Sequence, residues 1–369
     1  MMHRLLLLMV LAVGAGAAER SEPSLGARFA DAFPIGMSVS GRVLRDPAAW
    51  ALVRHHARVL TSENDMKPHR IMPTAGSATF ARADRFMAAS ASAGLPVIGH
   101  TLVWHIQAPP WFFADIPDGS ATAAVVLDRL RGYIGTVAGR YRGRIQAWDV
   151  VNEALADGPG DRFLRDSPWS RATGEAFLIE AFRAAAAADP GAKLLYNDYE
   201  IESEPKRSRV IRLVRLLRAA GCRIDGVGIQ GHWTLEHPRI AVIDAAIKTF
   251  AAEGLEVHIT ELDVTVLPRH AEGGNLLAVA TATDADDPFR AGLPPEIQGR
   301  LAERYRELFA CFLANRKTIA RVTFWNVHDG DSWLNNWPVQ GRTDHPLLFD
   351  RNLLPKPAFQ AVLDTLAAP

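Results

Sequence analysis

Two glutamates close apolar runs of the sequence and could together perform acid–base chemistry. Glu153 follows the run from Ile145 to Asn152, and Glu261 follows the run from Val257 to Thr260. A single glutamate is ordinarily a solvated surface charge. If both runs are strands whose ends converge, however, the two side chains can face each other across a common mouth. Hydrolysis of a glycosidic bond needs such a pair, because one carboxyl protonates the leaving oxygen while the other acts at the anomeric carbon.

The run around Glu261 carries a second acid. Strict alternation along an extended strand places Val257, Ile259, Glu261 and Asp263 on one face, which we expect to be the interior of the fold. Two interior acids need hydrogen-bond partners. His232, at the end of another apolar run, is placed to supply one.

Polar and aromatic residues gather where the other apolar runs end. Six of the nine tryptophans lie in or just after these ends, whereas tryptophans used only for packing would be scattered through the core. The residues at the ends are Glu63, Asn64, Lys67, His100, Trp104, Gln107, Trp111, Asn152, Gln230, Trp233, Trp325, Trp333 and Trp337. Indoles stack on the C–H faces of sugar rings, and amide, carboxylate and amine groups bind sugar hydroxyls. The pattern therefore favours a neutral, polyhydroxylated ligand.

Eight short apolar or β-branched runs alternate with longer amphipathic stretches. We expect strands at residues 34–40, 59–65, 97–105, 145–153, 193–199, 226–232, 257–263 and 321–329, and helices that include 177–188, 208–220, 239–253 and 295–314. Such alternation predicts an α/β fold, a single (β/α)8 barrel whose active site lies at the carboxyl ends of the strands. The rival is an open doubly wound sheet, but neither GxGxxG nor GxxxxGK[ST] occurs. We predict one catalytic domain over residues 25–367.

Charge and motif content exclude several other functions. With 41 Lys+Arg against 41 Asp+Glu, the formal net charge is +0 and no global field recruits nucleic acid or an anionic membrane. HExxH and GxSxG are absent, and His100 and His105 lie five apart on an expected strand and so on opposite faces. We therefore expect no metal and no cofactor. Cys222 and Cys311 form either one bridge or two buried thiols.

The first eighteen residues are typical of a secretory signal peptide. Arg4 precedes an unbroken apolar run from Leu5 to Val13, and small residues follow from Ala15 to Ala18. The run is too short for a permanent span, which needs about 20 apolar residues. An N-terminal helix that docks on the fold is the alternative. We expect a signal peptide over residues 1–18, export to the periplasm or the medium, no membrane association after its removal, and a monomer.

Six motifs at the expected strand ends resemble glycoside hydrolase family 10. They are TSENDMK (61–67), GHTLVWHIQAPPW (99–111), WDVVNEA (148–154), GIQGHW (228–233), ITELDV (259–264) and FWNVHDGDSWL (324–334). The motifs occur in the expected order, and the resemblance runs from about residue 33 to 362. Members of that family are (β/α)8 endo-β-1,4-xylanases that retain anomeric configuration, so the resemblance implies this fold and activity, with xylan or xylo-oligosaccharide as substrate.

The resemblance also implies roles for individual residues. Glu153 would be the acid/base, Glu261 the nucleophile, and Asn152 the partner of the sugar 2-hydroxyl, while His232 and Asp263 would orient Glu261. The glycone side would be lined by Glu63, Asn64, Lys67, His100, Trp104 and Gln107, with Trp325 and Trp333 closing over it. Gln230 would also contact substrate, and Tyr199 and Trp233 would serve the aglycone side. A cis peptide between His100 and Thr101 is implied as well.

Three residues depart from the family pattern. Asn326 stands where Gly usually follows the tryptophan, Glu200 where Asn often follows Asn-Asp-Tyr, and Ile106 where Ser is frequent. None is part of the glutamate pair, but each could alter affinity for substrate. Two alternative functions remain: another retaining barrel glycosidase, such as a cellulase or mannanase, and a polysaccharide-binding protein without activity.

Overall fold

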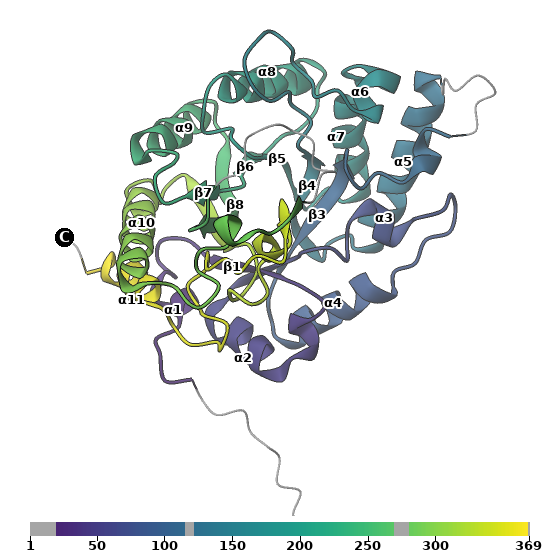
Figure 1. Cartoon of the computed structure of the whole chain (residues 1–369). Coiled ribbons are helices and arrows are strands. Elements are labelled where there is room, and N and C mark those ends of the chain that lie inside the picture. Colours follow the sequence, from purple (N-terminus) through teal and green to yellow (C-terminus); the bar gives the residue numbers. More distant parts are fainter. Residues whose placement is uncertain (1–19, 115–121, 269–279, 368–369) are drawn as a thin grey trace, which may run out of the picture.

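The computed structural model describes residues 20–114, 122–268 and 280–367, which form one closed barrel ringed by helices (Figure 1). Neighbouring strands pair in parallel in the order β10-β1-β2-β3-β4-β5-β6-β8, and β10 also pairs with β8, which closes the ring. The barrel strands are β1 (Ile35–Val39), β2 (Val59–Ser62), β3 (Val97–Trp104), β4 (Ile145–Asn152), β5 (Lys193–Asp198), β6 (Gly226–Ile229), β8 (Glu256–Thr265) and β10 (Ile319–Phe324). The predicted (β/α)8 fold is confirmed.

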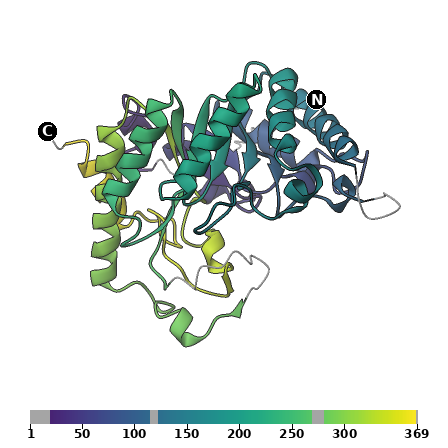
Figure 2. The ribbon, with the colours of Figure 1, turned by 90° about the horizontal axis from the view of Figure 1, so that it is seen from above.

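Helices cover the outside of the barrel. They are α1 (Leu25–Arg28), α2 (Pro47–His56), α3 (Pro68–Ile71), α4 (Ala81–Ser92), α5 (Ala123–Arg140), α6 (Pro168–Thr173), α7 (Ala176–Ala188), α8 (Lys206–Ala219), α9 (Ile240–Ala252), α10 (Pro295–Ala314) and α11 (Pro357–Asp364). Short elements lie in the connections: η1 (Val43–Arg45), η2 (Pro110–Phe112), η3 (Asp284–Asp286), η4 (Trp333–Asn335), β7 (His232–Thr234), β9 (Ala280–Thr281) and β11 (Val339–Gln340). The segments after β8 and β10 gather at one end of the barrel, where parallel strands present their carboxyl ends (Figure 2).

The apolar core has two parts. A large cluster lies between strands and helices, and a small layer of Val59, Ile98, Ala147 and Leu195 belongs to four successive strands. Packing in the core is close: a Cβ on Gly99 would lie 2.1 Å from the Trp148 indole, so only glycine fits at that position.

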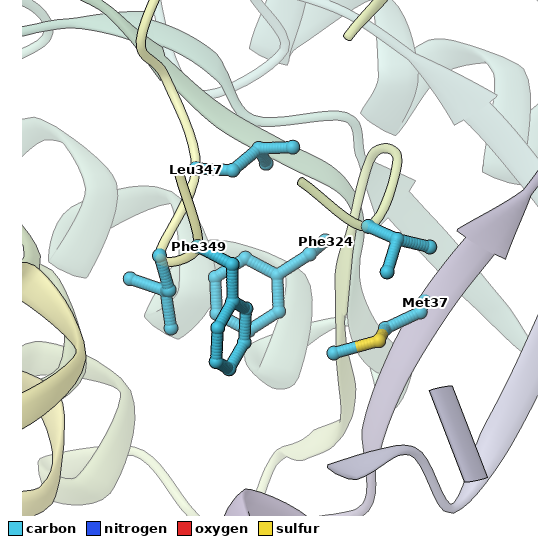
Figure 3. Close-up of a pocket in the computed structure, with 6 residues that line it drawn as sticks. Met37, Phe324, Leu347 and Phe349 are labelled. Carbon is cyan, nitrogen blue, oxygen red and sulfur yellow. The ribbon is translucent and has the colours of Figure 1, made fainter. Parts of the chain in front are cut away.

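A hollow near the barrel wall is filled by apolar side chains. It lies between β1, β10 and residues 347–349, and it leaves no room for a water molecule (Figure 3). The residues around it are Met37, Phe324, Val327, Leu347, Leu348 and Phe349. None of these side chains is polar, so the hollow is part of the apolar core and offers no group for binding a polar ligand or for catalysis.

Two details of the strands differ from expectation. The run expected at 226–232 divides at Gly231, whose φ is +87°, so His232 begins the separate strand β7, which pairs with β8. The strict alternation expected in β8 is also wrong. Val257 and Ile259 pack in the large cluster with the helices, whereas Thr260 donates to Asn197 of β5, two strands away, at 2.6 Å.

A bulge explains the altered alternation. Between paired positions, β8 advances from Ile259 to Leu262 while β10 advances only from Val322 to Phe324. The extra residue lets Glu261 share the interior side with Thr260, and Asp263 follows on that side. The expectation of an interior Glu261 is thus met by a different backbone route.

Both cysteines, Cys222 and Cys311, are free and buried. In the described ranges no helix is long and apolar enough to span a bilayer. The expected signal peptide lies outside the described residues, and the domain limits 25–367 stay a prediction.

Candidate active site

Glu261 lies inside the barrel mouth among groups that favour its ionised form. His232 Nε2 is 3.2 Å from its Oε2, and Asn197 Nδ2 donates to its Oε1 at 2.7 Å. The side chain is only 5% exposed. Burial alone would raise the pKa of Glu261, but the His232 hydrogen bond and the nearby charges of His100 and His232 outweigh burial and hold that pKa well below its usual range.

His232 is sandwiched between two carboxylates. Its Nδ1 lies 3.0 Å from Asp263 Oδ2, opposite the Nε2 contact to Glu261. Burial disfavours an imidazolium here, but Asp263 and Glu261 outweigh it and raise the pKa of His232. The protonated ring donates to both acids at once, as expected for His232 and Asp263.

Glu153 lies immediately after β4 and has a different environment. Gln230 Nε2 donates to its Oε1 at 2.9 Å, and Trp104 Nε1 donates to its Oε2 at 2.7 Å. Its φ of +55° is in the left-handed region, which turns the chain sharply at the end of the strand. Asn152, before it, accepts from Asn197 Nδ2 at 2.8 Å, so both residues face the mouth.

His100 is held beside the pair. Its Nδ1 lies 2.9 Å from Asp149 Oδ2, and its ring meets the Trp325 indole edge to face at 5.3 Å. The peptide bond between His100 and Thr101 is cis, as the resemblance implied. Trp325, 5% exposed, also faces His232 at 6.4 Å and thus lies against both histidines.

One wall of the site is formed by residues after β2 and β3. Lys67 Nζ donates to Asn64 Oδ1 at 3.2 Å and lies 4.8 Å from the centre of the Trp104 ring. Burial lowers the pKa of Lys67, and Glu63, Glu261 and Glu153 oppose that change. Burial and the nearby Asp331 raise the pKa of Glu63. The wall combines amide, ammonium and carboxyl groups with an indole face, the set that suits sugar hydroxyls.

Trp333, which follows β10, contacts Asp263, the acid that bonds His232. Its Nε1 donates to Asp263 Oδ2 at 2.8 Å, and its ring stacks on Trp337 at 4.8 Å with the planes 14° apart. Its backbone N–H donates to Asn326 Oδ1 at 3.0 Å. The indole is therefore held by two contacts and the backbone of Trp333 by a third.

Two of the expected aromatic residues do not join the mouth. Trp233 is 2% exposed and packs near Phe312, while its Nε1 donates to Glu202 at 3.1 Å. Strand β7 turns the Trp233 side chain toward the core, and the substrate contact expected for this residue stays a prediction. Trp111 donates to Met72 O and stacks on Phe112, so its role is packing.

The remaining expected residues lie at the edge of the site. Tyr199 donates to Asp157 at 2.7 Å and accepts from Arg165. Gln107 lies in the turn after β3, and its buried Oε1 has no protein partner within the described residues. Of the three departures, Glu200 and Asn326 have φ of +58° and +78°, a region that suits Gly and Asn. At both positions the backbone therefore has a left-handed conformation, although the residue differs from the family pattern.

Asn197 is a functional residue that the sequence analysis missed. It ends β5 beside Asp198 and bonds Glu261, Asn152 and Thr260 at once. Its position at a strand end, the same signal used for Asn152, could have identified it.

One group of side chains in the described ranges could hold a metal, and it lies apart from the glutamates. Glu22, His55 and His56 meet where α2 ends and β2 has not begun, at the amino end of the strands. His56 Nδ1 accepts from Leu25 N, so its Nε2 carries the proton that faces Glu22. The cluster is satisfied as a structural contact.

A closed parallel barrel whose mouth holds two buried glutamates, amide donors and indoles defines a carbohydrate-cleaving hydrolase. The sequence model of glycosyl hydrolase family 10 matches residues 24–365, and the chain belongs to that family. Endo-1,4-beta-xylanase B of Paenibacillus barcinonensis is 40% identical over 341 residues, which cover 92% of this chain and 98% of that protein. An endoxylanase structure from a sugarcane soil metagenome has a TM-score of 0.86 at 36% identity, over 94% of this chain and 100% of that one. A mutant structure in complex with xylotriose has a TM-score of 0.83 at 35% identity, over 93% and 100%.

Proposed function

We propose that the protein is a retaining endo-1,4-β-xylanase that cleaves internal bonds of xylan or xylo-oligosaccharides by double displacement. Glu261 is the nucleophile and Glu153 is the acid/base. The observation that carries the assignment is the asymmetry of the pair. Glu261 is bonded by a histidine sandwiched between two acids, whereas the side chains that donate to Glu153 within the described residues are neutral. A permanently ionised carboxylate suits attack, and a carboxyl free of cationic partners within hydrogen-bond distance suits proton exchange.

In the first step Glu261 attacks the anomeric carbon. An oxygen of its carboxylate bonds to that carbon as the bond to the leaving sugar breaks, and Glu153 gives its proton to the leaving oxygen. His232 and Asn197 hold the attacking carboxylate in one orientation. The products are a glycosyl ester of Glu261 and the leaving sugar fragment, whose released oxygen is now a hydroxyl at a new non-reducing end.

In the second step a water molecule displaces Glu261 from the anomeric carbon. Glu153, now a carboxylate, takes a proton from the water as its oxygen bonds to the anomeric carbon, and Glu261 departs as a carboxylate. Two inversions at one carbon give net retention. Neither of these two reaction steps requires a metal or a cofactor.

Xylan as substrate is supported by the relatives' names and by the xylotriose bound to one of them. In this chain, Trp325 and Trp333 lie against the ring of His232, which contacts the nucleophile. Xylose lacks the C5 hydroxymethyl group of glucose, so a preformed indole wall can accept xylose and reject glucose by bulk. Asn152 accepts from Asn197, which leaves its Nδ2 as the end of the amide for a sugar 2-hydroxyl.

The test is product analysis over time on arabinoxylan, linear xylo-oligosaccharides, cellulose and mannan. We expect xylo-oligosaccharides of intermediate length first, with retained β-configuration. A cellulase or mannanase would release products faster from glucan or mannan, and an unchanged polymer after long incubation would indicate a binding protein.

We further propose that the protein is exported after removal of residues 1–18, acts as a monomer through a catalytic domain over residues 25–367, and binds neither nucleic acid nor membranes once processed. The neutral net charge supports the last point. N-terminal sequencing of the protein from culture fractions would test the cleavage, and light scattering would test the oligomeric state.

A further inference from the structure

The chain just after Glu153 is held by contacts that the reaction scheme does not use. Glu153 has φ +55°, a conformation that non-glycine residues keep only where their surroundings hold it. Its own N–H donates to Asn197 O at 2.9 Å. The position of its carboxyl therefore depends on what fixes the two peptides that follow.

The hydroxyl of Tyr196 fixes both of those peptides. It accepts hydrogen bonds from the N–H groups of Ala154 at 3.0 Å and Leu155 at 3.1 Å, and it donates its own proton to Asp198 Oδ2. The ring is 0% exposed, in the strand next to β4. With two acceptor positions and one donor position all used, the hydroxyl can take only one orientation.

Asp198 is itself anchored. Lys206 Nζ lies 2.7 Å from Asp198 Oδ1 and 2.8 Å from Asp157 Oδ1; Lys206 and Asp198 are buried, and Asp157 is partly exposed. The tyrosine is thus attached to a fixed acid rather than to a mobile surface group.

Arg165 holds the same turn from the other side. Its Nε donates to Glu153 O at 3.0 Å, and its guanidinium pairs with Asp157 at 2.7 Å. Its backbone N–H donates to Ala154 O at 2.9 Å. Tyr196 and Arg165 together bond both sides of the turn that carries Glu153.

We propose that Tyr196, with Arg165, is a positioning residue for the acid/base: its hydroxyl holds the Glu153 turn so that the carboxyl reaches the leaving oxygen. This inference rests on the proposed role of Glu153. It assigns to Tyr196 no contact with substrate, only the placement of the group that exchanges the proton.

The experiment measures kcat/KM of Tyr196→Phe on two substrates in the intact protein. Cleavage of xylohexaose releases a poor leaving group, another sugar, and needs the proton from Glu153. Cleavage of 2,4-dinitrophenyl β-xylobioside releases a dinitrophenolate, which departs without being protonated. The ratio of the two values does not depend on the fraction of enzyme that is folded. General acid catalysis contributes about 10²–10⁴-fold, so partial misplacement of Glu153 is expected to lower the xylohexaose value by about tenfold while the aryl value changes less than about twofold.

Two other buried tyrosines supply matched controls. Tyr133 has a hydroxyl without a partner in the described part of the chain, so Tyr133→Phe removes the same atom and no hydrogen bond. Tyr141 donates to Asp84 on the outer helices, so Tyr141→Phe removes a hydrogen bond far from the mouth. Both are expected to leave the ratio unchanged. Arg165→Lys, which removes the Nε donor but keeps the charge, is expected to lower the ratio as Tyr196→Phe does.

A ratio for Tyr196→Phe equal to that of Tyr133→Phe would overturn the positioning role, whatever happens to thermal stability. Failure of the proposed function is separately visible: Glu153→Ala would then lower both substrates equally. If Glu153→Ala discriminates between the substrates and Tyr196→Phe does not, only the present inference is wrong.

Discussion

Glu153 and Glu261 are joined by an unbroken chain of amide hydrogen bonds. From Glu153 Oε1 it passes through Gln230 Nε2 (2.9 Å), to Asn152 Oδ1 (3.4 Å), to Asn197 Nδ2 (2.8 Å), and ends at Glu261 Oε1 (2.7 Å). Gln230 and Asn197 each use both protons of one amide group, so neither can rotate without breaking a bond to a glutamate. The chain fixes the spacing of the two acids without placing a charge between them.

Substitution of Asn197 tests whether the chain of amide hydrogen bonds contributes to catalysis. Asn197→Ala removes a hydrogen bond to a charged group, worth about 1.5–3 kcal/mol, so kcat should fall by roughly tenfold to a hundredfold with little change in KM. Asn315→Ala is the control, since Asn315 bonds Asp244 and Cys311 O at the end of α10. Equal effects of the two variants would mean that Asn197 has no part in catalysis.

Glu153→Ala should separate substrates by leaving group. Without the proton donor, xylan hydrolysis should fall by about 10²–10⁴-fold, while glycosyl-enzyme formation from an activated aryl xylobioside is spared. Burst kinetics on the aryl substrate would measure the spared step. Equal losses on both substrates would assign the proton transfer to another group.

His232→Asn should move the acid limb of the pH profile upward. Glu261 must be ionised to attack, and the His232 hydrogen bond is the largest of the effects that keep its pKa low against the opposing effect of burial. Removal of that donor raises the pKa of Glu261, so the carboxylate is lost at a higher pH as the solution is acidified. The measurement is kcat/KM from pH 3 to 8. If the hydrogen bond between His232 and Glu261 is worth ~1.4 kcal/mol, the acid limb should move upward by about one pH unit. An unmoved acid limb would contradict the role given to His232.

Truncation of Trp333 should weaken xylan turnover and narrow the preference for xylan over glucan. Loss of a preformed wall removes the clash that excludes a hydroxymethyl group, a discrimination expected to exceed the ~1–3 kcal/mol of one methylene. Trp333→Ala removes the wall and the bond to Asp263, whereas Trp333→Phe keeps a ring and loses only the bond. If both variants keep the wild-type ratio of the two activities, other residues form the wall.

The order of strands and the pair of glutamates could be predicted because they depend on local pattern. Each barrel strand contains a short apolar run, and each glutamate stands where such a run of the sequence ends, although β8 itself continues past Glu261 to Thr265. His232 and Asp263 could also be paired by their need for partners, and the structure confirms that contact.

Side-chain direction near a strand end was harder to predict. The bulge in β8 arises from pairing with β10, which lies far along the chain, so strict alternation misplaced Val257 and Ile259. The short strand β7 likewise turns Trp233 toward the core, a direction that local pattern does not indicate. The place of Asn197 near a strand end marks it as a candidate, but its hydrogen-bond partners belong to other strands and have no local signal. These positions are decided by tertiary contacts.

The most direct test of the central claim is covalent trapping of the nucleophile. A 2-deoxy-2-fluoro xylobioside with a good leaving group is incubated with the enzyme, and the labelled peptide is identified by mass spectrometry. Retaining enzymes hold their two carboxyls about 5–5.5 Å apart, which lets Glu261 attack the anomeric carbon directly and form an ester. The fluorine at C2 destabilises the oxocarbenium-like transition state, so this ester hydrolyses slowly. We predict one label per chain, on Glu261, and no label in folded Glu261→Gln. A label on another residue, or an enzyme that stays unlabelled while it releases product of inverted configuration, would contradict the account.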